Sequence, residues 1–229
     1  MTRSGFFLLI IGFFGFACAA PKGDCDIKKL DACAADIFVF ATANKVPTTA
    51  AEHKPYCAKQ LKSEACARDY VKRCTDSVVQ GIASIFLDDV KAEIEERCSK
   101  GSTYQNDFFK HAPCLNKAGD SVHRCFQNVN TDMDVASRLP TKQRIGGACC
   151  KFNVFEACVL RAVEEKCSNE AVEFTKGLLD RYAGELLGTV CTTYRSGEKC
   201  KSIVFDSQPG DKNIRAVLTP LITVAAALG

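Results

Sequence analysis

Apolar residues recur every three or four positions along most of the chain, which is the spacing of an amphipathic helix. In the first half this spacing predicts helices over residues 24–44 and over Ser77–Cys98. A Val-Pro-Thr step interrupts the pattern between them, and a further helix is expected to begin near Thr48. Pro55 is expected to divide that helix, so that its regular part runs from about residue 56 to residue 74.

The second half repeats this arrangement. Helical spacing predicts segments over residues 114–134, 141–167 and 169–191. No stretch alternates polar and apolar residues for more than a few positions, as a half-buried strand would. We therefore expect an all-α fold with about three helices in each half.

The cysteines of the first half recur in the second half at a nearly constant offset. Five of them have a counterpart 92 or 93 residues later, and Val46-Pro47-Thr48 is matched in the same way by Leu139-Pro140-Thr141. Cys25 has a looser partner in Cys114. The series indicates two tandem disulfide-stapled units that arose by internal duplication. The five matched pairs are Cys33 with Cys125, Cys57 with Cys149, Cys66 with Cys158, Cys74 with Cys167, and Cys98 with Cys191.

The first 19 residues have the pattern of a secretory signal peptide. Arg3 precedes an unbroken apolar run from Phe6 to Phe16, and Ala17-Cys18-Ala19 is the small-x-small triplet that signal peptidase cleaves. Cleavage after Ala19 removes one of the 15 cysteines and leaves 14. An even number of cysteines in a secreted chain predicts complete pairing into disulfides.

The repeat restricts how these cysteines can pair. Six should pair within each unit in the same order, which leaves Cys200 to pair with one member of the Cys149-Cys150 doublet and clamp the C-terminal segment. Spacing from the flanking cysteines makes Cys149 the counterpart of Cys57, whereas spacing from the preceding proline favours Cys150. The predicted disulfide cysteines are Cys25, Cys33, Cys57, Cys66, Cys74, Cys98, Cys114, Cys125, Cys149, Cys150, Cys158, Cys167, Cys191 and Cys200.

The chain therefore divides into a signal peptide (1–19), a first unit (20–104), a second unit (105–203) and a polar linker with an apolar tail (204–229). The tail from Ala216 onward is uncharged and too short for an ordinary transmembrane helix, so no such helix is expected in the mature chain. Its polar spacer resembles a GPI-anchor signal, although the cleavage context is poor. A loosely packed or disordered tail is the other expectation.

Charge and motifs exclude several classes of function. The net charge of +3 becomes +2 when Arg3 leaves with the signal peptide, which is too small to indicate nucleic acid as a partner. His53, His111 and His123 lack the spacing of metal ligands, and no Gly-x-Ser-x-Gly nucleophile motif occurs. We therefore expect no metal, no cofactor and no enzymatic activity.

Two sets of charged residues are predicted to lie on solvated helix faces. The acidic set is opposite the apolar stripe of Ser77–Cys98, and the basic set on the preceding helix is expected to meet it across the bundle. His123 is expected on the surface. The acidic residues are Asp88, Asp89, Glu93, Glu95 and Glu96, and the basic residues are Lys59, Lys62, Arg68, Lys72 and Arg73.

Phenylalanines are the remaining candidates for a site. Eight of them could line a pocket for an apolar ligand between the two units, although the same residues also suit a hydrophobic core. They are Phe38, Phe40, Phe86, Phe108, Phe109, Phe152, Phe155 and Phe174.

The cysteine frame is similar to that of one group of secreted proteins. The signal peptide, the paired helical units and the Cys-Cys-x7-Cys-x8-Cys run from Cys149 to Cys167 resemble the arthropod 27 kDa hemolymph glycoproteins and related cysteine-rich secreted proteins of arthropods and nematodes. The resemblance implies an extracellular or haemolymph protein. No Asn-x-Ser/Thr sequon occurs, so N-glycosylation is not expected.

These observations predict a secreted, non-enzymatic, disulfide-rich helical protein of the extracellular space or haemolymph. It would bind either a partner protein or an apolar small molecule. Two alternatives stay open: a secreted defence or venom-type effector or inhibitor, acting through an exposed loop such as Ser99–Asn106, and a GPI-anchored interaction protein of the cell surface.

Overall fold

The computed structural model describes residues 25–228, so the predicted signal peptide lies outside the described residues. Within residues 25–228 the chain forms seven α-helices and three short 3-10 helices, with no strand. The predicted all-α fold is confirmed for this part of the chain. The α-helices are α1 (Ile27–Ala34), α2 (Ala50–Cys74), α3 (Ser77–Cys98), α4 (Thr103–Ser137), α5 (Thr141–Glu164), α6 (Asn169–Val190) and α7 (Leu218–Ala225).

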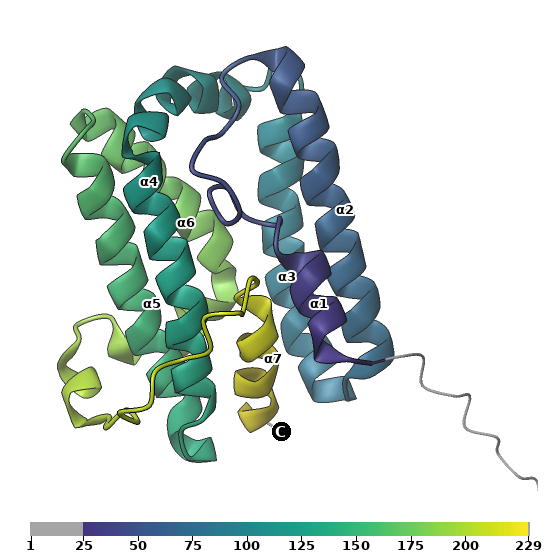
Figure 1. Cartoon of the computed structure of the whole chain (residues 1–229), viewed down its shortest axis with the longest axis vertical. Helices are drawn as coiled ribbons and strands as arrows, with labels where there is room; N and C mark the ends of the chain where they lie inside the picture. The colour runs from purple at the N-terminus through teal and green to yellow at the C-terminus, as the bar shows by residue number, and fades with distance from the viewer. Residues whose placement is uncertain (1–24, 229) are drawn as a thin grey trace, which may run out of the picture.

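The helices form two groups that lie side by side, with α7 between them (Figure 1). The first group consists of α1, α2 and α3, and the second of α5, α6 and most of α4. α4 joins the two, because it begins beside the end of α3 and continues into the second group (Figure 1). The predicted boundary between residues 104 and 105 therefore falls inside the first turn of α4.

Seven disulfides staple the helices. Both groups have the same pairing order, as the repeat predicts, although the duplication itself stays a prediction. Cys149 is the counterpart of Cys57, and Cys150 is the extra member of the doublet that bonds Cys200. The pairs are Cys25–Cys74, Cys33–Cys66 and Cys57–Cys98 in the first group, Cys114–Cys167, Cys125–Cys158 and Cys149–Cys191 in the second, and Cys150–Cys200.

α1 ends at Ala34, well before the predicted end near residue 44. The segment that follows is irregular, and it buries both Ile37 and Val39. The Gln60 side chain donates to the Ile37 carbonyl oxygen at 2.9 Å, and the Val39 N–H donates to the Tyr182 hydroxyl at 3.4 Å, so side chains of other helices take the place of helical hydrogen bonds there. Phe40 has a left-handed backbone conformation, with φ of 61°, and turns the chain at this point.

α2 runs without interruption through Pro55, which was predicted to divide it. Its start is capped from both sides, since the Thr49 hydroxyl accepts from the Glu52 N–H at 3.3 Å and the Glu52 carboxylate accepts from the Thr48 N–H at 3.2 Å. Pro55 lies in the second turn next to exposed residues, where the carbonyl that it cannot bond faces water.

α4 begins at Thr103, earlier than the predicted start at residue 114. The Ser102 hydroxyl caps it by accepting from the Gln105 N–H at 3.0 Å. The predicted exposed loop Ser99–Asn106 is consequently a short turn followed by helix. The other predicted helices fit more closely: α3 matches at both ends, α5 begins where predicted and ends three residues early, and α6 begins where predicted and ends one residue early.

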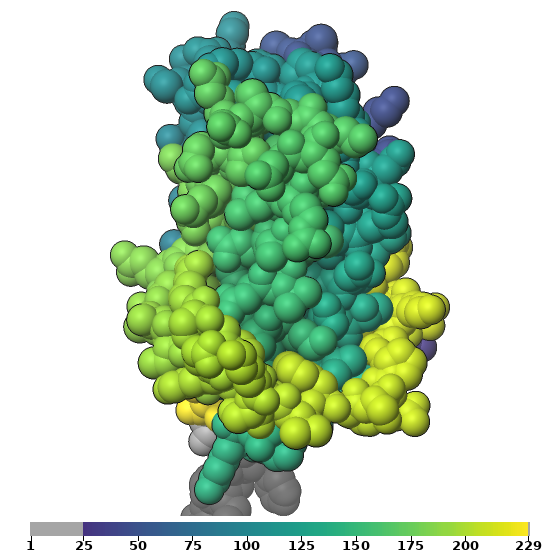
Figure 2. All heavy atoms as spheres, turned by 90° about the vertical axis from the view of Figure 1, so that its left-hand side faces the viewer, coloured from purple at the N-terminus to yellow at the C-terminus, as the bar shows by residue number. Residues whose placement is uncertain are grey.

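The apolar tail forms α7 and packs against α1, α3, α4 and α5, so the expectation of a loose or disordered tail is wrong. Leu218 and Val224 are only 3% and 5% exposed, because α7 buries apolar side chains that water would otherwise solvate. The segment before α7, residues 203–217, is called the strap here. It wraps around one end of the second group (Figures 1 and 2).

No helix between residues 25 and 228 combines the length and the apolar character that crossing a bilayer needs. The GPI anchor stays a prediction.

Candidate functional site

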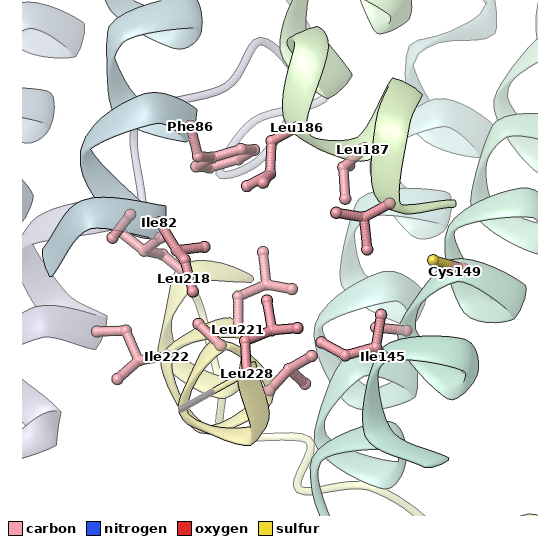
Figure 3. Close-up of a pocket in the computed structure, with 15 residues that line it drawn as sticks. Ile82, Phe86, Ile145, Cys149, Leu186, Leu187, Leu218, Leu221, Ile222 and Leu228 are labelled. Carbon is pink, nitrogen blue, oxygen red and sulfur yellow. The ribbon is translucent and has the colours of Figure 1, made fainter. Parts of the chain in front are cut away.

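Two adjoining apolar cavities lie where the two helix groups meet α7. Their volumes are about 70 and 60 Å³, and we refer to the pair as the chamber. Phe86, Ala148, Leu187 and Leu221 line both cavities. Figure 3 shows the side chains around the first cavity converging on one space from α3, α5, α6 and α7. Other residues of the lining include Ile82, Ile145, Cys149, Leu186, Val190, Leu218, Ile222 and Leu228 in the first cavity and Phe38, Phe126, Met133, Phe152, Phe155 and Tyr182 in the second.

A break in α6 directs its last turns toward the chamber. Gly184 has φ of 57° and ψ of −168°, which interrupts the helix, and the residues after the break supply Leu186, Leu187 and Val190 to the lining. Glycine is required there because its φ is positive and because a Cβ would lie 1.9 Å from the Asp89 carboxylate.

α7 is held at its N-terminus by a carboxylate from the other end of the chain. The Asp31 side chain, in α1, accepts from the N–H groups of Arg215 and Ala216, each at 3.0 Å, and from the Thr219 hydroxyl at 3.0 Å. The side chain of the N-cap residue, Val217, makes no capping hydrogen bond. Asp31 therefore anchors the two residues that precede the N-cap and, through the Thr219 hydroxyl, the first turn of α7.

The lining provides apolar contact and little else. Apart from Tyr182, every side chain that lines the two cavities is hydrocarbon or contains only sulfur as a heteroatom. Burial raises the pKa of Tyr182 well above its ordinary value, so the phenol stays protonated. Its oxygen accepts from the Val39 N–H at 3.4 Å. The chamber therefore suits an apolar ligand and offers no general acid or base.

The structure places four of the eight predicted phenylalanines in the chamber lining: Phe38, Phe86, Phe152 and Phe155. Phe40 lines a much smaller neighbouring cavity. The remaining three, Phe108, Phe109 and Phe174, pack around His53, Tyr104 and His111 instead.

The prediction missed the aliphatic residues of α6 and α7 that complete the chamber. Leu186 and Leu187 could have been found from the sequence, because they are adjacent near the end of a predicted helix. A single apolar stripe facing the core does not account for two adjacent leucines. The signal for the residues of α7 was the apolar tail, which was assigned to processing or disorder.

A second buried cluster, which is polar, lies under the Cys57–Cys98 disulfide. Arg97 is fully buried, and its guanidinium donates to the Glu93 carboxylate at 2.7 Å and to the side-chain amide oxygen (Oε1) of Gln60 at 2.8 Å. Burial alone would lower the pKa of Arg97, but the Glu93 carboxylate raises it above its ordinary value. The prediction of a solvated Glu93 is wrong, because this residue pairs with Arg97 inside the first group.

Asp88, Glu95 and Glu96 are exposed as predicted, whereas Asp89 is half-buried against Gly184. Asp88, on α3, pairs across the bundle with Arg68 of α2 at 2.8 Å, which is the contact expected between the acidic and basic sets. Lys59 instead pairs with Asp36, and Arg73 pairs with Asp69 on its own helix. Exposed pairs of this kind contribute little to stability.

His53 belongs to the polar cluster. The imidazole is 2% exposed, contacts Arg97 and Gln105 at 3.5 and 3.4 Å, and packs on Phe108. Burial, followed by the Arg97 charge, lowers its pKa to about 4. Its ring nitrogens lie close to the sulfurs of Cys57 and Cys98, but these sulfurs form a disulfide and are not thiolates that could bind a metal.

His123 is half-buried, not on the open surface as predicted. Its Nδ1 lies 2.7 Å from the Phe40 carbonyl oxygen, to which it donates.

The chamber and the polar cluster occupy corresponding positions in the two groups. Each adjoins the matching disulfide, Cys149–Cys191 or Cys57–Cys98. Cys57 corresponds to Cys149, and Cys98 corresponds to Cys191. At four positions with the same sequence offset from these cysteines, the first group has a polar residue and the second group has an apolar one. The corresponding residues are His53 and Ile145, Gln60 and Phe152, Glu93 and Leu186, and Arg97 and Val190.

The described residues thus define a disulfide-rich, all-helical protein whose two helix groups enclose an apolar chamber. Comparison of the chain with protein families, curated proteins and solved structures finds no match.

Acidification is expected to destabilise the protein through His53. The folded state holds this pKa near 4, below the ordinary 6.5, so the unfolded chain binds more protons between these values. The contribution of His53 to the free energy of unfolding is present in full above pH 6.5 and falls as the pH drops toward 4, by about 3 kcal/mol.

Chemical denaturation of wild type and His53→Gln from pH 7 to pH 4 measures this loss. The difference in unfolding free energy between the two proteins should shrink on acidification. His123→Gln serves as the control and should follow the wild type. Parallel curves for wild type and His53→Gln would contradict the prediction.

Proposed function

We propose that the protein is a secreted carrier that holds a small apolar molecule in the chamber and performs no chemistry on it. The observation that carries the proposal is the lining of the two adjoining cavities, which is almost wholly hydrocarbon and lies between two covalently stapled helix groups. Apolar surface that a ligand buries in such a site contributes about 25 cal/mol per Å². A rigid frame adds affinity by limiting the entropy that is lost on binding.

Secretion is supported by the disulfides. All fourteen cysteines between residues 25 and 228 are paired, and such bonds persist in oxidising compartments. The predicted signal peptide agrees with this compartment. The similarity to the hemolymph glycoproteins stays a prediction.

Native mass spectrometry of protein purified from its own source tests the proposal. Mass lost on denaturation would support a bound small molecule. If no mass is lost and N-phenyl-1-naphthylamine, an apolar fluorescent probe, does not bind the purified protein, the carrier function is wrong. The denatured mass also tests the GPI anchor, since anchoring would remove the residues of α7.

Ala148→Leu is expected to weaken probe binding at least tenfold, because Ala148 lines both cavities and the added atoms fill the space between them. Stability should change little, since the new side chain occupies existing space. Fluorescence titration measures the affinity. Ala58→Leu, on the exposed side of α2, is the matched control and should bind like the wild type. Equal affinities for all three proteins would place the probe outside the chamber.

A further inference from the structure

We propose that α7 is an internal occupant of the ligand site, and that a long neutral hydrocarbon chain binds by displacing it. This inference rests on the proposed carrier function and extends it to the route of entry and the class of ligand.

The first argument is volume. Cavities of about 70 and 60 Å³ are far smaller than the roughly 300–1,000 Å³ of typical ligand pockets. A molecule of more than a few heavy atoms therefore needs space that side chains now fill. Leu221 of α7 lines both cavities, so its departure would join them into one. Figure 3 shows Leu218, Leu221, Ile222 and Leu228 as one side of the space around the first cavity.

The second argument is how α7 is attached. Helices α1 to α5 carry disulfide cysteines, and disulfides at Cys167 and Cys191 hold both ends of α6, whereas the chain after Cys200 has no cysteine. The Cys150–Cys200 disulfide fixes the chain just before the strap. Polar contacts hold the strap and the start of α7. Asp31 accepts from the strap residues Arg215 and Ala216 and from Thr219 of α7. Asn130 donates to the Ile214 carbonyl oxygen at 3.3 Å. α7 can therefore leave and stay tethered, while the remaining helices keep their covalent frame.

The third argument concerns the chemistry of what replaces α7. The helix has the sequence LTPLITVA, which carries no charge, and its Leu and Ile side chains occupy the site as the methylenes of a hydrocarbon chain would. Once α7 leaves, the Asp31 carboxylate loses the Thr219 hydroxyl and lies beside the space that the first turn of the helix has vacated. A negative charge there disfavours a fatty-acid carboxylate and favours a neutral head such as a hydroxyl. The ligand class is therefore a long-chain alcohol or similar neutral lipid.

Hydrogen–deuterium exchange of the full-length protein tests the displacement. On saturation with dodecan-1-ol, amides of residues 216–228 should exchange faster, while those of the disulfide-bonded α2 should not change. Slower exchange in residues 216–228 would show that α7 stays in place as a wall of the site, and would overturn the inference while leaving the carrier function intact. If neither dodecan-1-ol nor the fluorescent probe binds, the carrier function itself fails.

Asp31→Ala supplies the complementary test. Weaker docking of α7 reduces the cost of displacing it, so the affinity for dodecan-1-ol should rise by about three- to tenfold. Competition against N-phenyl-1-naphthylamine measures the affinity, and Asp69→Ala, which removes an exposed carboxylate remote from α7, should leave it unchanged. Dodecanoate should bind the wild type more weakly than the alcohol and should gain more from Asp31→Ala. A lower affinity of Asp31→Ala for dodecan-1-ol would overturn the proposal.

Discussion

Arg97→Met is expected to lower the free energy of unfolding by about 3–5 kcal/mol. The substitution leaves the Glu93 carboxylate, which is 1% exposed, without its counter-charge in the core of the first group. It also removes the donor to Gln60. Guanidinium denaturation followed by circular dichroism measures the loss, since the chain has no Trp to serve as a fluorescent reporter.

Two further variants separate charge burial from packing. Glu93→Leu combined with Arg97→Val installs the residues of the corresponding positions in the second group, Leu186 and Val190. The double variant should recover most of the loss, because replacing both partners leaves no unpaired charge. Arg73→Met, which breaks an exposed pair, should cost less than about 1 kcal/mol. A double variant less stable than Arg97→Met would contradict this account.

Removal of the seventh disulfide by Cys150→Ala with Cys200→Ala is expected to cost about 3 kcal/mol. The two cysteines are 50 residues apart, and a free loop of that length would correspond to about 4 kcal/mol. The neighbouring Cys149–Cys191 bond already closes most of this loop, so the seventh bond adds only a ring of about 12 residues in the unfolded chain.

The same denaturation experiment measures this loss, with both cysteines replaced so that no free thiol can exchange. Val204→Ala is the control at a nearby position, since that side chain is 83% exposed. It should leave stability unchanged. A loss below about 1 kcal/mol for the double cysteine variant would show that the bond does not restrict the unfolded chain as supposed.

The sequence predicted elements well where one apolar stripe and clear end signals coincide. α3 is the best case, since Asp76 caps its start and its stripe runs to Cys98. The prediction failed where tertiary contacts override local preference. Ile37 and Phe38 fit the predicted helical pattern, yet the chain there is irregular because side chains of α2 and α6 satisfy its backbone groups. Pro55 was predicted to divide α2 because the stabilising effect of the Thr49 cap on the first turns of the helix was not considered.

The candidate site was predicted only in part, for a related reason. Hydrophobicity places Phe86 and Phe152 in the interior but does not say whether the space beside them is filled. That depends on α7, whose packing against distant helices leaves no periodic signal in a short apolar tail. Glu93 shows the reverse problem, because a charged residue was assigned to solvent when its partner four residues later lies in the same buried turn.

Contacts on both sides of Pro113 restrict bending of α4, and this limits how the two helix groups can move relative to one another. Pro113 interrupts the hydrogen bonding of α4 and is the natural pivot between the two groups. The Lys110–Glu170 ion pair and the His111–Phe174 stack tie the residues before the proline to α6. The Cys114–Cys167 disulfide ties the residue after it to the segment just before α6. The two groups should therefore tumble as a single body in solution, with one rotational correlation time, whether the chamber is full or empty.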